Sequence, residues 1–212
     1  METTEVSDHA EVLHTSTGLD SRKLAIWTFI GSECMFFATL ISNYLVHKGK
    51  SLVGPFAHEA WTDPATGKVF EPIIEIPLVT LGTALLLFSS LFVVLALANA
   101  QRGNRRGLLT WLAATLFCGF FFVGMQVYEF THFVHKGLTL KTNLFGASFF
   151  TLTGFHGTHV TLGVIWLLTL WILALRGKLP AEKSLNLEIA ALYWHFVDVV
   201  WIAIFTLIYL LQ

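Results

Sequence analysis

Five long stretches of apolar residues constrain this chain more than any other feature, because each is long enough to cross a lipid bilayer. A hydrocarbon core about 30 Å thick needs roughly 20 helical residues. The stretches cover residues 24–46, 76–101, 107–131, 145–175 and 189–211. Lipid cannot hydrogen-bond an exposed backbone, and the stretches are too long for barrel strands, so each is expected to be a helix. The sequence predicts an all-α polytopic membrane protein, a bundle of five transmembrane helices.

The charge content agrees with a chain that faces lipid. Only 13% of the 212 residues are charged, whereas a soluble domain carries roughly 25%. The chain has no basic stripe, so nothing predicts a nucleic-acid partner. Its two cysteines, Cys34 and Cys118, both lie in apolar stretches and are too few for a disulfide framework. We expect a polar N-terminal tail over residues 1–21 and a single transmembrane domain over residues 22–212.

The basic residues predict how the helices are oriented in the membrane. If the N-terminus is cytoplasmic, that side receives eight of them: Arg22, Lys23, Arg102, Arg105, Arg106, Arg176, Lys178 and Lys183. The opposite side keeps five: Lys48, Lys50, Lys68, Lys136 and Lys141. Cytoplasmic loops are enriched in Lys and Arg. The distribution therefore favours an N-in and C-out arrangement.

A few ionisable residues interrupt the apolar stretches and are the candidate site. Glu33 lies in the first stretch, His156 and His159 lie in the fourth, and His195 and Asp198 lie in the fifth. At about 1.5 Å per helical residue, most of them reach a similar depth near the middle of the bilayer. Such residues are costly in lipid and usually face partners or a polar cavity. We expect a hydrogen-bonded polar network that joins the helices, the fourth and fifth above all.

Three more specific functions for the same residues stay open. Imidazole and carboxylate together suit zinc or iron, although the His spacing of i and i+4 that helical zinc enzymes use is absent. A haem held by His156 or His159 together with His195 is a second alternative. An ion or proton transporter that uses Glu33 and Asp198 is a third.

Three further polar residues lie towards the ends of the predicted helices. Glu75 precedes the second stretch, and Gln126 and Glu129 lie near the end of the third. We expect water to reach these side chains and their roles to be those of helix-end polarity and capping.

Five sequence blocks resemble signatures of subunit III of the haem–copper terminal oxidases. The two most specific are residues 154–160 (GFHGTHV) and 193–202 (YWHFVDVVWI). Three more follow the order of the family: residues 32–37 (SECMFF), 74–78 (IEIPL) and 124–130 (GMQVYEF). Many members of this family have two additional N-terminal helices, so the chain resembles the five-helix bacterial form.

The resemblance implies an accessory role without cofactors. It implies a non-catalytic subunit of a proton-pumping cytochrome c oxidase, an enzyme of aerobic electron transport that reduces O2 to water in the bacterial cytoplasmic membrane. Its partners would be subunits I and II, which carry the haems and copper, together with bound phospholipid. The subunit would pack on subunit I and support proton uptake and stable turnover.

The resemblance also implies roles for the ionisable residues. Glu33 would match the buried carboxylate of the family, and His156, His159, His195 and Asp198 would match its interhelical polar set. Cytochrome c or quinol acts on other subunits, so the same subunit of a quinol-oxidising enzyme is the nearest alternative.

Overall fold

The computed structural model describes residues 20–51, 54, 60–62, 67, 69–70, 76–180 and 184–211. Its five long helices are α1 (Ser21–His47), α2 (Ile76–Gln101), α3 (Arg105–His135), α4 (Leu144–Leu175) and α5 (Ser184–Phe205). A π-helical turn, η2 (Thr206–Leu210), continues α5. Each helix is long and apolar enough to cross a membrane, α5 together with η2. The prediction of an all-α chain with five helices long and apolar enough to cross a membrane is confirmed.

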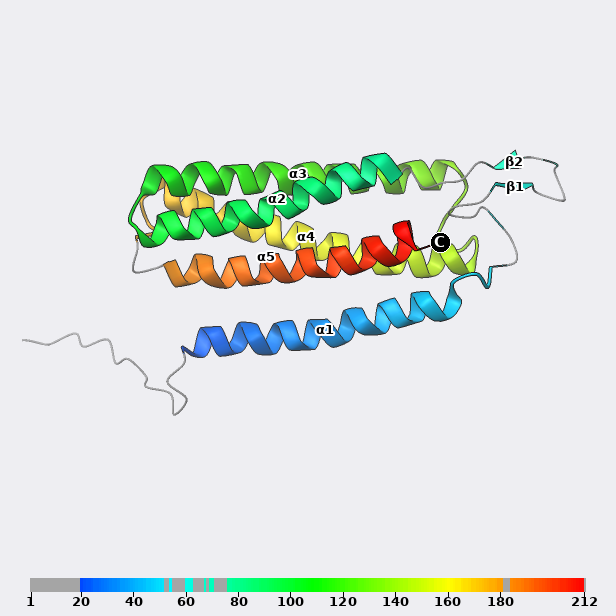
Figure 1. Cartoon of the computed structure of the whole chain (residues 1–212), viewed down its shortest axis with the longest axis horizontal. Coiled ribbons are helices and arrows are strands. Elements are labelled where there is room, and N and C mark those ends of the chain that lie inside the picture. The colour runs from blue at the N-terminus through cyan, green and yellow to red at the C-terminus, as the bar shows by residue number, and fades with distance from the viewer. Residues whose placement is uncertain are drawn as a thin grey trace, which may run out of the picture.

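The helices run side by side, and successive helices point in opposite directions (Figure 1). The start of α1, the α2–α3 turn and the α4–α5 link lie at one end of the bundle. The other end holds the C-terminus, the α3–α4 link and a small antiparallel hairpin of β1 (Trp61–Thr62) and β2 (Val69–Phe70). The connections after α2, α3 and α4 are short, so each of these helices is followed by one that runs back beside it. The predicted tail over residues 1–21 lies almost wholly outside the described residues.

Local sequence signals set the helix boundaries. The side chains of Asp20, Asn104 and Asn143 accept hydrogen bonds from backbone N–H groups in the first turns of α1, α3 and α4, which satisfies donors that the helix itself leaves free. At the other ends, the chain takes a positive φ at Gly103 and Gly177 (70° and 68°). Glycine adopts this conformation without steric cost, so these positions end α2 and α4.

Helix α5 occupies the centre of the bundle and contacts the other four helices through buried aromatic residues. Trp194 donates its indole N–H to Ser89 of α2 over 2.9 Å. Trp201 donates to Thr83 of the same helix, also over 2.9 Å. Such bonds let a large apolar ring pack in the core while its single polar group stays satisfied.

Two glycines make room for Trp194. A Cβ atom on Gly119 of α3 would lie 3.0 Å from the indole ring, and one on Gly163 of α4 would lie 2.9 Å from it. The ring is only 1% exposed. The indole therefore lies between two helices that approach closely because both positions lack a side chain, the arrangement expected of small residues in membrane bundles.

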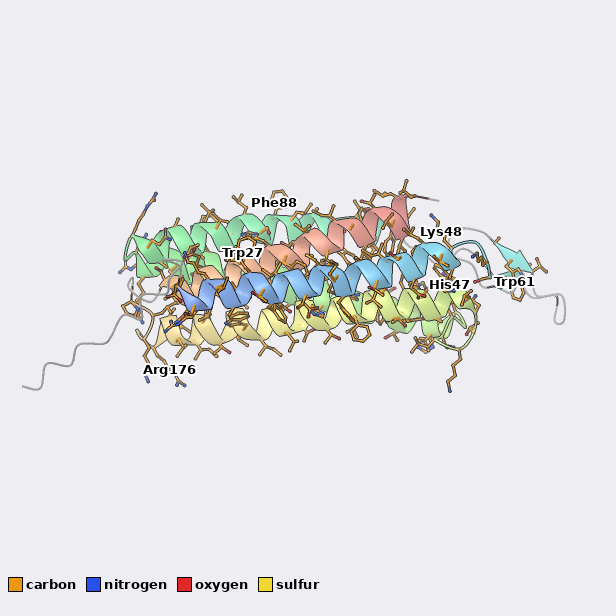
Figure 2. The ribbon with its side chains drawn as sticks, turned by 90° about the horizontal axis from the view of Figure 1, so that it is seen from below. Trp27, His47, Lys48, Trp61, Phe88 and Arg176 are labelled. Carbon is orange, nitrogen blue, oxygen red and sulfur yellow. The ribbon has the colours of Figure 1, made fainter. Side chains whose placement is uncertain are left out.

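Helix α1 lies on the outside of the bundle, across the face formed by α4 and α5 (Figure 2). It is the least buried of the five, with Trp27 and Met35 58% and 75% exposed. At one end Lys23 forms an ion pair with Glu188 of α5 over 2.6 Å. Because both side chains are about one-third exposed, we expect this pair to stabilise the fold by only about 0–1 kcal/mol.

The packing of Trp194 generates a stability prediction. Gly163→Ala places a methyl group against the indole ring and should lower the free energy of unfolding by about 1–3 kcal/mol, the usual cost of overpacking. Gly124→Ala is the matched control, because a Cβ atom there meets nothing within 4 Å, and it should be neutral or slightly stabilising. The thermal midpoint of the detergent-solubilised protein measures both. Equal midpoints would show that the indole does not require the glycine.

Candidate functional site

Glu33 of α1 is paired with His159 of α4. The Glu33 Oε2 and His159 Nε2 atoms are 3.2 Å apart, and the side chains are 19% and 14% exposed. The other ring nitrogen, Nδ1, lies 2.8 Å from the carbonyl oxygen of Phe155. A carbonyl only accepts hydrogen bonds, so Nδ1 carries a hydrogen. The orientation and tautomer of the ring are therefore set by its own helix.

The fixed tautomer determines how many protons the pair holds. A neutral imidazole protonated at Nδ1 has a bare Nε2, which accepts only from a protonated Glu33. A doubly protonated imidazole donates instead to the Glu33 carboxylate. Either way one proton lies between the two side chains and the pair has no net charge. This is the arrangement that a medium of low dielectric constant favours.

Aromatic rings enclose the pair on the protein side. The centroid of the Phe37 ring is 5.0 Å from that of His159, in an edge-to-face arrangement. Tyr193 of α5 donates its hydroxyl to the His159 carbonyl over 3.0 Å. The pair thus lies at the seam between α1 and α4, close to α5, with part of both side chains towards the outside of the bundle.

A second polar cluster joins α5 to α2. The Ser90 hydroxyl contacts both the Asp198 carboxylate, at Oδ2, and the His195 imidazole, at Nδ1, over 2.7 Å in the latter case. Asp198 is only 3% exposed. Its Oδ1 atom is enclosed and has no hydrogen-bond partner among the described residues.

His156 stands apart from both clusters. It is fully buried, and neither ring nitrogen has a hydrogen-bond partner within the part of the chain that the structure describes. Its ring stacks on Trp201, with centroids 4.9 Å apart and planes 22° apart. Phe122 meets it edge-on at 6.1 Å. Its surroundings are those of a core aromatic residue.

These contacts differ from the single network that we expected between the fourth and fifth helices. The side-chain bonds of His159 lead to α1, those of His195 and Asp198 lead to α2, and His156 bonds to neither. A spacing of three residues leaves two side chains about 60° apart around a helix. His156 and His159 therefore face different neighbours, although they share one side of α4.

Gln126 and Glu129 are buried, at 5% and 4% exposure, which corrects the expectation that water reaches them. The Gln126 amide donates to the Thr153 carbonyl over 3.0 Å, and Glu129 accepts from the Tyr209 hydroxyl over 3.0 Å. The reason is the length of α3, which continues to His135 and so leaves them about 14 and 9 Å inside its end. Glu75 lies outside the described residues.

Sequence reasoning missed the partners of these groups. Polar atoms of other helices form hydrogen bonds with Ser89 and Ser90 in α2, with Thr83 nearly two turns earlier, and with Tyr209 in η2. The one available signal was the Ser89–Ser90 pair in an otherwise apolar stretch. It was weak, because a hydroxyl usually bonds a carbonyl of its own helix in a membrane.

The arrangement allows proton sharing more readily than metal binding. Among the described residues, no three His, Cys, Asp or Glu side chains gather in a way that could hold a metal ion. Both clusters instead link a carboxylate to an imidazole, directly or through one hydroxyl. Each link can hold a proton near the middle of the span.

The Glu33–His159 geometry predicts different outcomes for two substitutions. Glu33→Gln keeps an N–H donor for the His159 Nε2 atom and should leave the thermal midpoint nearly unchanged. Glu33→Leu leaves that nitrogen without a partner and should lower the free energy of unfolding by about 1–3 kcal/mol. Thermal unfolding of the solubilised protein compares the two. A Gln variant as unstable as the Leu variant would contradict the shared-proton pairing.

Comparisons with known proteins give the chain its family. A model of the family described as cytochrome c oxidase subunit III matches residues 2–212. Cytochrome c oxidase subunit 3 of Bacillus sp. (strain PS3) is 37% identical over 188 residues, which cover 89% of this chain and 84% of that protein.

Other relatives carry the names of quinol oxidases. Quinol oxidase subunit 3 of Bacillus subtilis (strain 168) is 38% identical over 89% of this chain and 86% of its own length. Cytochrome bo(3) ubiquinol oxidase subunit 3 of Pseudomonas aeruginosa is 34% identical over 96% of this chain and 89% of its own length. The family match and these identities over most of both chains place this protein in the cytochrome c oxidase subunit III family, the third subunits of the haem–copper terminal oxidases.

Proposed function

We propose that this chain is the accessory, cofactor-free subunit III of a proton-pumping cytochrome c oxidase. It packs on subunit I, binds phospholipid, and supports proton uptake and stable turnover. The observation that carries the proposal is the Glu33–His159 pair, which holds one proton at a partly exposed seam near the middle of the span. A side chain in that position can exchange a proton with a neighbouring subunit while the fold stays intact.

The remaining ionisable groups support a structural role within the same subunit. Asp198 and His195 are engaged with Ser90, and Glu129 is engaged with Tyr209. Hydrogen bonds between membrane helices contribute about 0.6 kcal/mol on average. These contacts therefore fix the relative rotation of the helices more than they stabilise the fold.

The orientation that we propose is N-in and C-out in a bacterial cytoplasmic membrane. The basic residues at the two ends of the bundle support this orientation. Arg176 lies at one end and Lys48 lies at the other (Figure 2). The end with the start of α1 and the α2–α3 turn holds most of the Lys and Arg residues. Partner subunits I and II would supply the haems and copper, and phospholipid would cover the exposed apolar faces that no partner subunit contacts.

A quinol oxidase, which differs from the first candidate in its electron donor, is the second candidate. A cytochrome c oxidase subunit and a quinol oxidase subunit are 37% and 38% identical to this chain, and identity this similar favours neither donor. Donor binding belongs to other subunits, so the purified complex decides.

Purification of the complex through a tag on this chain tests the proposal. We expect a haem–copper catalytic subunit to co-purify, together with a copper-bearing subunit that accepts electrons from cytochrome c. A complex without that copper subunit, which oxidises quinol, would support the second candidate. The separated chain should show no stoichiometric Soret band and no proton flux in liposomes; either signal would favour a haem protein or a transporter.

Glu33→Gln tests the role of the shared proton in turnover. The amide preserves the hydrogen bond to His159 but cannot release its proton, so the complex should assemble and then lose activity sooner during sustained oxygen consumption. The variant and the unmodified complex are compared by following oxygen uptake to inactivation. Tyr128→Phe, at an exposed position of α3, is the control for a substitution elsewhere on the surface. Identical time courses for all three would remove Glu33 from the function.

A further inference from the structure

His195 presents a polar atom at the surface of the bundle, in the middle of the membrane. It lies in the span Ser184–Leu210, about 17 Å from one end and about 23 Å from the other. Its Nδ1 atom is 2.7 Å from the Ser90 hydroxyl, while the described residues provide no hydrogen bond to Nε2. The side chain is only partly buried. An imidazole nitrogen at this depth therefore faces out of the chain.

The Ser90–Asp198 contact determines whether the Nε2 atom of His195 carries a hydrogen. If Asp198 is protonated, it donates to Ser90, Ser90 donates to Nδ1, and Nε2 carries the hydrogen of the neutral imidazole. If the proton has moved to His195, Nδ1 donates to Ser90, Ser90 donates to the Asp198 carboxylate, and Nε2 again carries a hydrogen. A bare Nε2 requires one of two other states: a negative charge on Asp198 that is buried without a counter-charge, or a proton on the enclosed Oδ1 atom of Asp198, which has no acceptor among the described residues. Both are costly, and in the two remaining states Nε2 is a donor.

Apolar side chains flank this donor on both helices. On α5, Val199 and Ile202 follow His195 at i+4 and i+7 and so share its face; they are 63% and 43% exposed. On α2, Leu87 lies three residues before Ser90 and Val94 lies four residues after it, and their side chains are 43% and 45% exposed. The two helices lie side by side, linked by the Trp194 and Trp201 bonds (Figure 1). The α2–α5 face, defined by these residues, is apolar apart from one N–H group.

We propose that the α2–α5 face binds a transmembrane helix of another oxidase subunit, and that this helix supplies a hydrogen-bond acceptor to His195 Nε2 near the middle of the bilayer. The acceptor is a side-chain hydroxyl, amide or carboxylate oxygen. The inference rests on the proposed assembly with a catalytic subunit and adds the surface through which this chain meets its partner.

The depth of His195 in the membrane favours a partner helix over a lipid as the source of the acceptor. The oxygen atoms of a phospholipid lie in the headgroup region, outside a hydrocarbon core about 30 Å thick, and an acyl chain has no acceptor. A donor that faces only hydrocarbon remains unsatisfied, which is unfavourable. A partner helix removes that cost and covers the adjoining Val199 and Ile202 side chains as well.

Crosslinking in the intact complex tests the location. Val199→Cys carries a benzophenone label in a Cys34→Ser background, because Cys34 is exposed and Cys118 is buried. We expect illumination to join this chain to a second subunit, identified by mass spectrometry. A label that reacts only with lipid or quinone, or not at all, overturns the proposal. If the complex co-purifies but the label crosslinks to no protein, the α2–α5 face is not the contact surface. If no catalytic subunit co-purifies, the proposed function itself fails.

Three variants test the hydrogen bond. His195→Leu removes the donor and should weaken the association about threefold, the change that an average hydrogen bond between membrane helices gives. His195→Gln keeps an N–H near the Nε2 position and should retain most of the association. Tyr128→Phe removes a hydroxyl at an exposed position of α3, away from this face, and serves as the control. Association is measured as retention of this chain while the detergent concentration rises, with the thermal midpoint as the check on folding. Equal losses for Tyr128→Phe and His195→Leu, or none for His195→Leu, overturn the proposal.

Discussion

The absence of water in the hydrocarbon core is the constraint on which this structure depends. It makes every backbone group bond within its own helix, and it makes each polar side chain find a partner, stay neutral or lie at a surface that another molecule covers. All three outcomes occur here. Glu129 is bonded across helices, Glu33 and His159 share a proton without net charge, and His195, bonded to Ser90 through Nδ1, is only partly buried.

Helix α5 shows how a membrane bundle obtains a unique packing when lipid is as apolar as its core. Leucine against leucine is no better than leucine against an acyl chain, so shape and hydrogen bonding have to select the arrangement. Trp194 supplies both, through its position between Gly119 and Gly163 and its bond to Ser89. Trp201 repeats the hydrogen bond two turns later with Thr83.

The number and type of the helices were predictable from the sequence, because the hydrocarbon thickness turns the length of an apolar stretch into a span. The identity of the polar residues in the site was predictable for the same reason. Their partners were not. The rotation of each helix depends on packing at positions such as Gly163, which an apolar stretch does not reveal, so His159 was expected to bond α5 and its side chain bonds Glu33 of α1 instead. The burial of Glu129 was missed because its partner, Tyr209, lies in a π-helical turn at the far end of the chain.

The Glu33–His159 pair has a consequence for a protein that lives in an energised membrane. A full elementary charge that crosses the bilayer at 100 mV changes its energy by about 2.3 kcal/mol. The shared proton moves over a contact of only 3.2 Å, roughly a tenth of a core about 30 Å thick. Its displacement along the field therefore changes the energy by at most about 0.2 kcal/mol, which is below thermal energy. The position of the proton within this pair is therefore nearly independent of the membrane voltage.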